Sequence, residues 1–317
     1  MKMDSKAIIF GIKSYKLTSK EKILLKKAKP WGIILFSRNI KNLEQTKKLI
    51  INIKSLMKDK KYPILIDEEG GSVSRLEKII DMTLFSQDYF GKIYYKNKNK
   101  FYDYYKIYIE TVSAILNELG ININTVPVLD IKRKKTNRII YYRSFSKNAN
   151  IVARLGKFCI AHYQKNKIAT VVKHIPGHGL SSSDSHLKLS KISNNKNYLI
   201  RNDFIPFKKC KSFFAMTAHI IYSAYDSKFT ATHSKKLIDE VIRKNIGFKG
   251  ILISDDISMK ALKYSLTKNA TMALEAGCNL VLHCNGNIKQ MNRLIKIVPS
   301  IDIFTQKKTS QFYKFLG

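Results

Sequence analysis

The chain has 317 residues, 44% of them hydrophobic, which is enough apolar material for one large α/β barrel or two ordinary domains. This composition excludes a globally disordered protein, and no run approaches the roughly 18 apolar residues of a transmembrane helix. The formal net charge is +35, but the lysines are spread along the whole chain among Ile, Asn and Tyr. Because no dense basic tract forms, we attribute much of the charge to codon bias and expect no nucleic-acid partner.

The N-terminus and the cysteines indicate the compartment. Met1 to Phe10 runs straight into an apolar segment and lacks the charged start, long apolar middle and cleavage site of a signal peptide. Free thiols in a reducing compartment are favoured over a disulfide framework or a thiolate zinc site. No CxxC pair occurs among the four cysteines, Cys159, Cys210, Cys278 and Cys284. We therefore expect a cytoplasmic protein without a membrane partner.

Short apolar, β-branched runs bounded by turn residues predict eight strands. Several of these runs are apolar on both faces, which is typical of a parallel sheet covered by helices. In chain order they are Ala7–Ile12, Gly32–Phe36, Tyr62–Asp67, Ile121–Asp130, Ile168–His174, Phe213–His219, Gly250–Asp255 and Asn279–Cys284.

Amphipathic stretches between these runs predict helices. Thr18 with Glu21 is a plausible N-terminal cap, and Gly247 is a plausible C-terminal stop. The predicted helices are Thr18–Ala28, Asn42–Met57, Tyr102–Leu119, Ile151–Lys165, Ser234–Asn245 and Ser258–Ala276. We assign no element to Leu76–Lys100, a candidate insertion over the barrel mouth, and expect a short helix or a frayed end from Gln306 onward.

Strands that alternate with helices in this way predict the α/β class and a closed, TIM-like (β/α)8 barrel. No linker rich in Pro, Gly or Ser divides the chain, so residues 1–317 are expected to form a single domain. An open doubly wound sheet is the alternative. It would be expected to carry a Gly-rich phosphate turn after the first strand, and none is there.

Ionisable residues stand where the predicted strands end. Because burying them is costly unless they face a polar cavity, their convergence on one rim predicts an active site there. They are Asp67-Glu68-Glu69 after the third strand, Asp130 after the fourth, Lys173-His174 at the fifth, His219 at the sixth and Asp255-Asp256 at the seventh.

The loop after the fifth strand carries Asp184 and His186. Their spacing would place both side chains on one face of an extended backbone. An aspartate bonded to one ring nitrogen fixes the histidine tautomer and favours the protonated ring, which leaves the other nitrogen to exchange a proton with substrate. A surface Asp–His pair without chemistry is the alternative.

A metal site is a further alternative, since several histidines share this rim. The first predicted strand lacks the His-x-His pair common in barrel metallohydrolases, and Pro176 and Gly177 keep His174 and His178 off a shared helical face. The candidate ligands would be His174, His178, His186, His219 and Asp255. We therefore expect no metal.

The string Lys173-His174-Ile175-Pro176-Gly177-His178-Gly179, followed by Asp184-Ser185-His186, resembles the bacterial β-N-acetylglucosaminidases of glycoside hydrolase family 3. The likeness is to the single-domain, peptidoglycan-recycling type and runs roughly from Ile9 to Asn285. It also covers Asp67-Glu68-Glu69-Gly70-Gly71, Pro127-Val128-Leu129-Asp130 and Ser254-Asp255-Asp256-Ile257-Ser258-Met259.

The resemblance implies a retaining enzyme that removes terminal β-linked N-acetylglucosamine from N-acetylglucosaminyl-anhydromuramyl peptides. Asp255 would be the nucleophile, and His186, oriented and charged by Asp184, would be the acid/base. The partner would be a small carbohydrate, no metal or organic cofactor is implied, and a monomer is expected. The implied contacts to the sugar are Asp67, Arg75, Arg143, Lys173 and His174.

Three positions depart from the family pattern, and two other functions stay open. The family usually has arginine at Ser72, Gly-Asp at Tyr141-Tyr142 and an acidic residue near Asn279, so the partner that would hold Arg143 is missing or replaced. A catalytically decayed barrel that binds wall fragments or polyanions is one alternative. Substrate-assisted hydrolysis, in which the 2-acetamido group attacks and Asp255 only stabilises charge, is the other.

Overall fold

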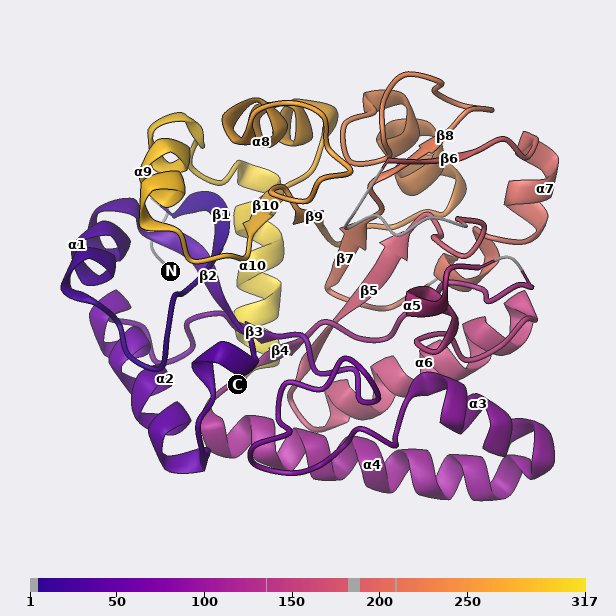
Figure 1. Cartoon of the computed structure of the whole chain (residues 1–317), viewed down its shortest axis with the longest axis horizontal. Helices are drawn as coiled ribbons and strands as arrows, with labels where there is room; N and C mark the ends of the chain where they lie inside the picture. The colour runs from indigo at the N-terminus through magenta and orange to yellow at the C-terminus, as the bar shows by residue number, and fades with distance from the viewer. Residues whose placement is uncertain (1–4, 135, 182–188, 209) are drawn as a thin grey trace.

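A computed structural model describes residues 5–134, 136–181, 189–208 and 210–317. In this part of the chain, eight parallel strands close into a barrel, and β1 pairs with both β2 and β10 (Figure 1). The barrel strands are β1 (Lys6–Gly11), β2 (Pro30–Leu35), β3 (Ile64–Ile66), β4 (Ile123–Asn124), β5 (Ala169–Ile175), β7 (Phe214–Thr217), β9 (Ile251–Asp256) and β10 (Leu280–His283). The eight predicted strands are confirmed in their predicted order. The closed barrel is also confirmed, and the open doubly wound sheet is wrong.

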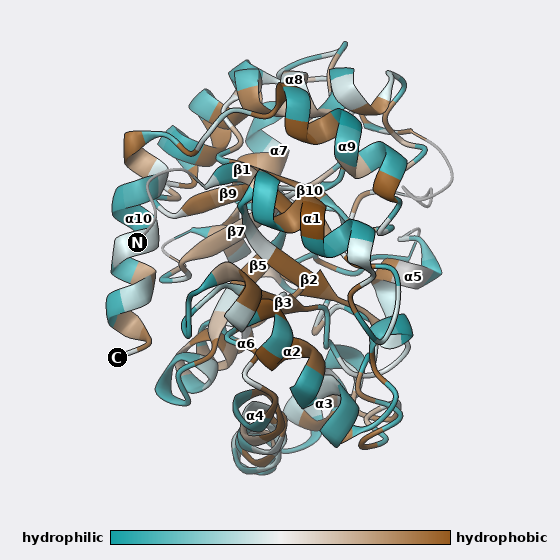
Figure 2. Cartoon of the chain, turned by 90° about the vertical axis from the view of Figure 1, so that its left-hand side faces the viewer, coloured by the Kyte–Doolittle hydropathy of each residue, from teal (hydrophilic) through white to brown (hydrophobic). Residues whose placement is uncertain are grey.

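The strands are buried on both faces because helices surround the barrel. Every residue of β2 and of β5 is buried, and the strands form the apolar centre of the molecule (Figure 2). β4 covers only Ile123–Asn124 of the predicted Ile121–Asp130, and Pro127 beyond it has no N–H to donate to a ladder. The chain beyond it still follows β5, since Leu129 N–H donates to the carbonyl of Lys173 over 2.7 Å.

Most helices begin at a side-chain cap. Thr18 and Glu21 form the predicted capping box, and Ser234 accepts from the N–H of Leu237 at the start of a π-helical segment. The helical elements are α1 (Ser19–Ala28), η1 (Ser37–Asn39), α2 (Leu43–Met57), α3 (Gln87–Lys96), α4 (Lys98–Leu119), α5 (Arg138–Tyr141), α6 (Ala149–Lys165), α7 (Lys196–Arg201), η2 (Ile205–Phe207), η3 (Leu237–Asn245), α8 (Leu266–Ala276), α9 (Ile288–Ile297) and α10 (Ile303–Phe315).

Several segments differ from the prediction, and the helices α5, α7 and α9 were not predicted. The unassigned Leu76–Lys100 contains α3 and the start of α4, which pack together beside the barrel (Figure 1). The helix predicted from Ser258 begins at Leu266, because Asp256 caps a turn at Ser258 and Ser265 caps the helix itself. The C-terminal tail forms α10, which begins at the Asp302 cap rather than at Gln306.

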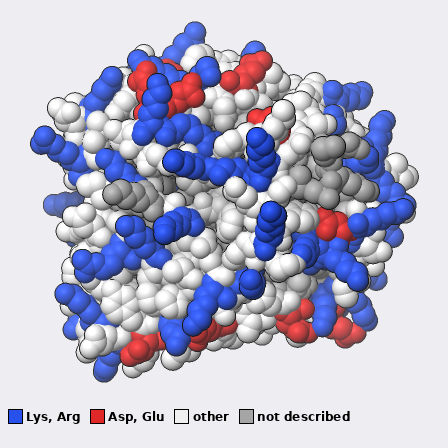
Figure 3. All heavy atoms as spheres, turned by 180° about the vertical axis from the view of Figure 1, so that it is seen from behind, with Lys and Arg blue, Asp and Glu red and all other residues white. Residues whose placement is uncertain are grey.

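A second, two-stranded sheet joins β6 (Ser190–Ile192) to β8 (Ile220–Tyr222), and the sequence did not predict it. None of the helices among the described residues has the length and apolarity that a bilayer crossing requires. Lys and Arg side chains are scattered over the rear face of the molecule, with acidic side chains between them (Figure 3). This scatter agrees with the absence of a dense basic tract in the sequence.

Candidate active site

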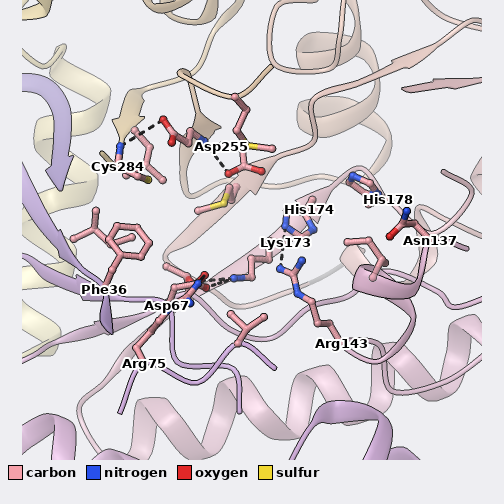
Figure 4. A pocket seen from close by; sticks show the side chains of 18 residues that line it. Phe36, Asp67, Arg75, Asn137, Arg143, Lys173, His174, His178, Asp255 and Cys284 are labelled. Atoms are coloured by element: carbon pink, nitrogen blue, oxygen red, sulfur yellow. Dashed lines mark hydrogen bonds and ion pairs between the residues drawn. The ribbon is translucent and has the colours of Figure 1, made fainter. Parts of the chain in front are cut away.

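A pocket of about 210 Å³ lies where the barrel strands end. Its walls come from β2, β5, β7, β9 and β10 and from the segments that follow β2, β3, β4, β5, β9 and β10, as expected for a (β/α)8 barrel (Figure 4). Six of the predicted site residues line it together: Asp67, Arg75, Arg143, Lys173, His174 and Asp255. The other two, Asp184 and His186, lie outside the described residues.

Asp67 follows β3 and sits between two cations. Its Oδ2 accepts from Arg75 Nη2 over 3.1 Å, and its Oδ1 accepts from Lys173 Nζ and from the hydroxyl of Thr125. Burial by itself would raise the pKa of this carboxyl, but Lys173, Arg75 and Arg143 outweigh it and hold the pKa well below its ordinary value. These cations therefore favour the charged form of Asp67.

Glu69 holds the two innermost cations of the pocket. Its carboxylate accepts from Arg143 Nε over 2.7 Å and from Arg143 Nη2 over 2.8 Å, and Lys173 Nζ lies 2.5 Å from Oε1. The three side chains are at most 9% exposed. A planar guanidinium bound in this bidentate way has a fixed orientation. Tyr141 and Tyr142 replace the residues in which the family pattern would place the partner of Arg143, and Glu69 is the residue that pairs with Arg143 here.

His174 lies one residue before the end of β5 and is oriented by Asp130. Nδ1 lies 2.7 Å from Asp130 Oδ2, and Nε2 faces the donor Arg143 Nη2 at 3.5 Å. Asp130 Oδ1 also accepts from the backbone N–H of His178 over 2.6 Å. Burial opposes ionisation of Asp130, but His174 and His178 together lower its pKa. Asp130 thereby fixes both the ring of His174 and the start of the loop after β5.

Asp255 stands at the end of β9, and Figure 4 shows it on the wall of the pocket opposite Asp67 and Arg143. Its neighbour Asp256 has a different task, since its Oδ1 accepts from the N–H and hydroxyl of Ser258 and from the N–H of Cys284. Asp256 therefore fixes the loops around the pocket, while Asp255 lines the space in which a substrate would lie.

His219 supports this strand end through both of its ring nitrogens. Its Nε2–H donates to the backbone carbonyl of Asp256 over 3.0 Å, and its Nδ1 accepts from Thr232 over 2.7 Å. Burial lowers its pKa, which keeps the ring neutral. Within the ranges described, no group of three or more His, Cys, Asp or Glu is placed to hold a metal ion.

The structure also shows where the other two residues that differ from the family pattern, Ser72 and Asn279, lie. Ser72 is exposed, so its side chain lies at the protein surface. Asn279 lies before β10, where its Oδ1 accepts from Arg243 Nη2 over 2.9 Å and from the N–H of Leu252 over 2.8 Å. An amide therefore serves as the acceptor at a position away from the pocket.

The sequence did not indicate Glu69, Thr125, Asp130 or His178 as part of a sugar site, although each contacts a predicted site residue. His178 was considered only as a ligand in the metal alternative. Glu69 stands in the acidic string after β3, and Asp130 was noted only as a strand end. Their position at strand ends could have marked them as site residues, but their partners could not be named. Glu69 and Arg143, for example, are separated by 74 positions.

Fold and pocket together define a (β/α)8-barrel enzyme with a polar, charged pocket for a small hydrophilic substrate. Residues 3–312 match the Glycosyl hydrolase family 3 N terminal domain, and the chain belongs to this family of glycoside hydrolases.

Similar proteins carry consistent names. A Beta-hexosaminidase of Alkalilimnicola ehrlichii is 33% identical over 285 residues, which cover 88% of this chain and 80% of that protein. The crystal structure of NagZ from Neisseria gonorrhoeae in complex with N-trifluoroacetyl-D-glucosamine is 29% identical with a TM-score of 0.87, covering 99% of this chain and 90% of that one. A glycoside hydrolase family 3 β-N-acetylglucosaminidase from Paenibacillus is 27% identical with a TM-score of 0.84, covering 98% of this chain and 60% of that one.

Proposed function

We propose that this glycoside hydrolase is an exo-acting β-N-acetylhexosaminidase that removes terminal β-linked N-acetylglucosamine from peptidoglycan fragments. The observation that carries the proposal is the pocket of about 210 Å³, in which Asp255 faces a set of buried and partly buried charges that are paired with one another. Charged groups make shorter and stronger hydrogen bonds to hydroxyls than neutral groups do. The similar enzymes named above, one of them holding an N-acylated glucosamine, support the choice of sugar.

The proposed reaction has two steps with retention of configuration. In the first step, a carboxylate oxygen of Asp255 attacks the anomeric carbon, the glycosidic C–O bond breaks, and His186 gives a proton to the leaving oxygen. In the second step, His186 takes a proton from water, the water oxygen attacks the anomeric carbon, and Asp255 leaves as a carboxylate. Asp184 orients His186 and favours its charged form.

The binding residues are proposed to hold the sugar hydroxyls. Asp67 offers an acceptor, while Arg75, Arg143 and Lys173 offer donors, and the pairing among these groups fixes their directions before substrate arrives. His174 presents Nε2 on the same wall. A pocket whose groups are already oriented loses little freedom on binding, which favours catalysis.

A cytoplasmic location is part of the proposal. All four cysteines are free thiols, as is usual in a reducing compartment.

Release of nitrophenol from an aryl N-acetyl-β-glucosaminide tests the function directly. We expect turnover by the wild type and a loss of roughly 10³-fold or more in Asp255→Ala, because the covalent step is removed. Asp239→Ala is the control, since this residue lies on η3 and pairs with Lys235 at the surface. Full turnover by Asp255→Ala would exclude Asp255 as the nucleophile. No turnover by the wild type, with salt-dependent binding of nucleic acid, would instead support the decayed barrel.

A further inference from the structure

Glu68 is a fully buried carboxylate beside the pocket whose side chain points into the loop that follows β3. It accepts from the backbone N–H groups of Gly70, Arg75 and Leu76 over 3.1, 2.5 and 2.9 Å, and from the hydroxyl of Ser74 over 3.3 Å. Burial raises the pKa of Glu68, and the four hydrogen-bond donors lower it again in part, because they stabilise the carboxylate. Glu68 therefore organises the loop from Gly70 to Leu76 around one carboxylate.

The backbone of Glu68 is itself fixed to the barrel. Asn124 of β4 accepts from the N–H of Glu68 over 3.1 Å and donates to its carbonyl over 2.9 Å. Gly70 permits the close packing of the loop, since its φ is +74° and a Cβ there would lie 2.4 Å from the carbonyl oxygen of Phe85. Two hydrogen bonds thus link the rigid barrel to Glu68, and four more link Glu68 to the loop.

The loop delivers Arg75 to the pocket. Its guanidinium donates to Asp67 over 3.1 Å and lies over the ring of Phe36 at 5.6 Å. Two adjacent carboxylates therefore bind Arg75: Asp67 accepts from its guanidinium, and Glu68 accepts from its backbone N–H. A change at Glu68 would move the guanidinium although Glu68 does not line the pocket.

We propose that Glu68 is a positioning residue that sets substrate affinity by holding Arg75 in place, an inference that rests on the proposed hydrolase function. Arg75 contacts the substrate in both the ground state and the transition state under this account. Its displacement would then raise KM and leave kcat nearly unchanged. Glu68→Gln keeps one oxygen for the donors of Ser74, Arg75 and Leu76 and loses only the acceptor for Gly70, so it should rescue most of the effect.

The chain offers a matched control in Glu21. This carboxylate is also buried and also cages a loop, accepting from the N–H groups of Lys13 and Thr18 over 2.9 and 2.8 Å. That loop follows β1 and contributes no residue to the pocket wall. Glu21→Ala should destabilise the protein much as Glu68→Ala does but leave KM unchanged, which separates positioning from general loss of structure.

The experiment measures KM and kcat on the aryl N-acetyl-β-glucosaminide for these variants alone and combined with Arg75→Ala. We expect Glu68→Ala to raise KM about 10-fold, Glu68→Gln less than about 3-fold, and Glu68→Ala to add less than about 2-fold once Arg75 is removed. An equal rise in KM with and without Arg75, or an equal rise in Glu21→Ala, would overturn the proposal.

Hydrogen exchange of the peptide spanning residues 70–76 supplies a readout that needs no activity. Exchange should be about 10-fold faster in Glu68→Ala than in the wild type and Glu68→Gln, because three backbone N–H groups lose their acceptor. Unchanged exchange would refute the positioning role even if the protein hydrolyses the substrate. Faster exchange without hydrolysis in the wild type would instead refute the proposed function and uphold the role of Glu68 in the loop.

Discussion

Replacing Glu69 by glutamine removes one buried negative charge behind Arg143 and Lys173, two residues of the pocket wall, without changing the size of the side chain. In the wild type this carboxylate faces Arg143 through two hydrogen bonds and Lys173 at 2.5 Å, with all three side chains nearly excluded from solvent. Breaking a buried ion pair costs about 3–5 kcal/mol, because the remaining charge has no compensation. The amide keeps one oxygen, so we expect the lower value, about 3 kcal/mol.

Thermal unfolding followed by circular dichroism measures this cost. At about 2 °C per kcal/mol for a chain of this size, Glu69→Gln should lower Tm by about 6 °C. The matched control is Glu118→Gln, since Glu118 lies at the same 2.5 Å from Lys47 but has an exposed side chain. Surface ion pairs contribute little, so the control should unfold with the wild type.

The same substitution should also weaken substrate binding, which is measured as KM on the aryl N-acetyl-β-glucosaminide. Arg143 loses one of its two anchoring oxygens in Glu69→Gln, so KM should rise about 10-fold. A Tm for Glu69→Gln that matches the wild type and Glu118→Gln would refute the assignment of Glu69 as the buried anchor of Arg143 and Lys173.

Three further predictions concern proton transfer, stability and pH. His186→Ala should lose far more turnover on substrates with poor leaving groups than on activated aryl glycosides, and equal losses would argue against His186 as the acid. Asn279→Asp should raise Tm by about 2 °C, because a carboxylate binds Arg243 more strongly than an amide does; an unchanged Tm would contradict this. Burial and the nearby His174 lower the pKa of His178 to about 4, below the value near 6.5 of the unfolded chain. Between these two pH values unfolding takes up a proton, so the free energy of unfolding of the wild type should fall by about 3 kcal/mol as the pH falls from 6.5 to 4. Denaturant titrations of His178→Gln should not show this loss.

The barrel could be predicted from the sequence because the information is local. Each strand is a short apolar run, and each is buried on both faces, so the runs stand out from the amphipathic helices between them. The prediction was weaker where tertiary contacts decide. β4 ends at Asn124, well before the predicted Asp130, and the small β6–β8 sheet depends on the pairing of Ser190 with Ile220, which are 30 positions apart.

The site was predictable in part for a similar reason. Ionisable residues at strand ends had to meet at one rim, and Asp67, Lys173 and Asp255 do. Which side chains pair with them depends on how distant segments pack. The hydrogen bonds of Glu69 to Arg143 and of Glu68 to its loop therefore could not be predicted from sequence spacing. Asp184 and His186 stay a prediction, since they lie outside the described residues.

Covalent trapping tests the central claim most directly. The probe is the glycosyl fluoride of N-acetylglucosamine with a second fluorine at C5, which keeps the 2-acetamido group. The second fluorine withdraws electrons and destabilises the oxocarbenium-like transition states, so both steps become slower. Mass spectrometry of the digested enzyme should then find the sugar on the peptide that contains Asp255, and on no peptide of Asp255→Ala. A label on another residue, or turnover of the fluoride without any covalent species, would contradict a nucleophilic Asp255 and favour attack by the acetamido group.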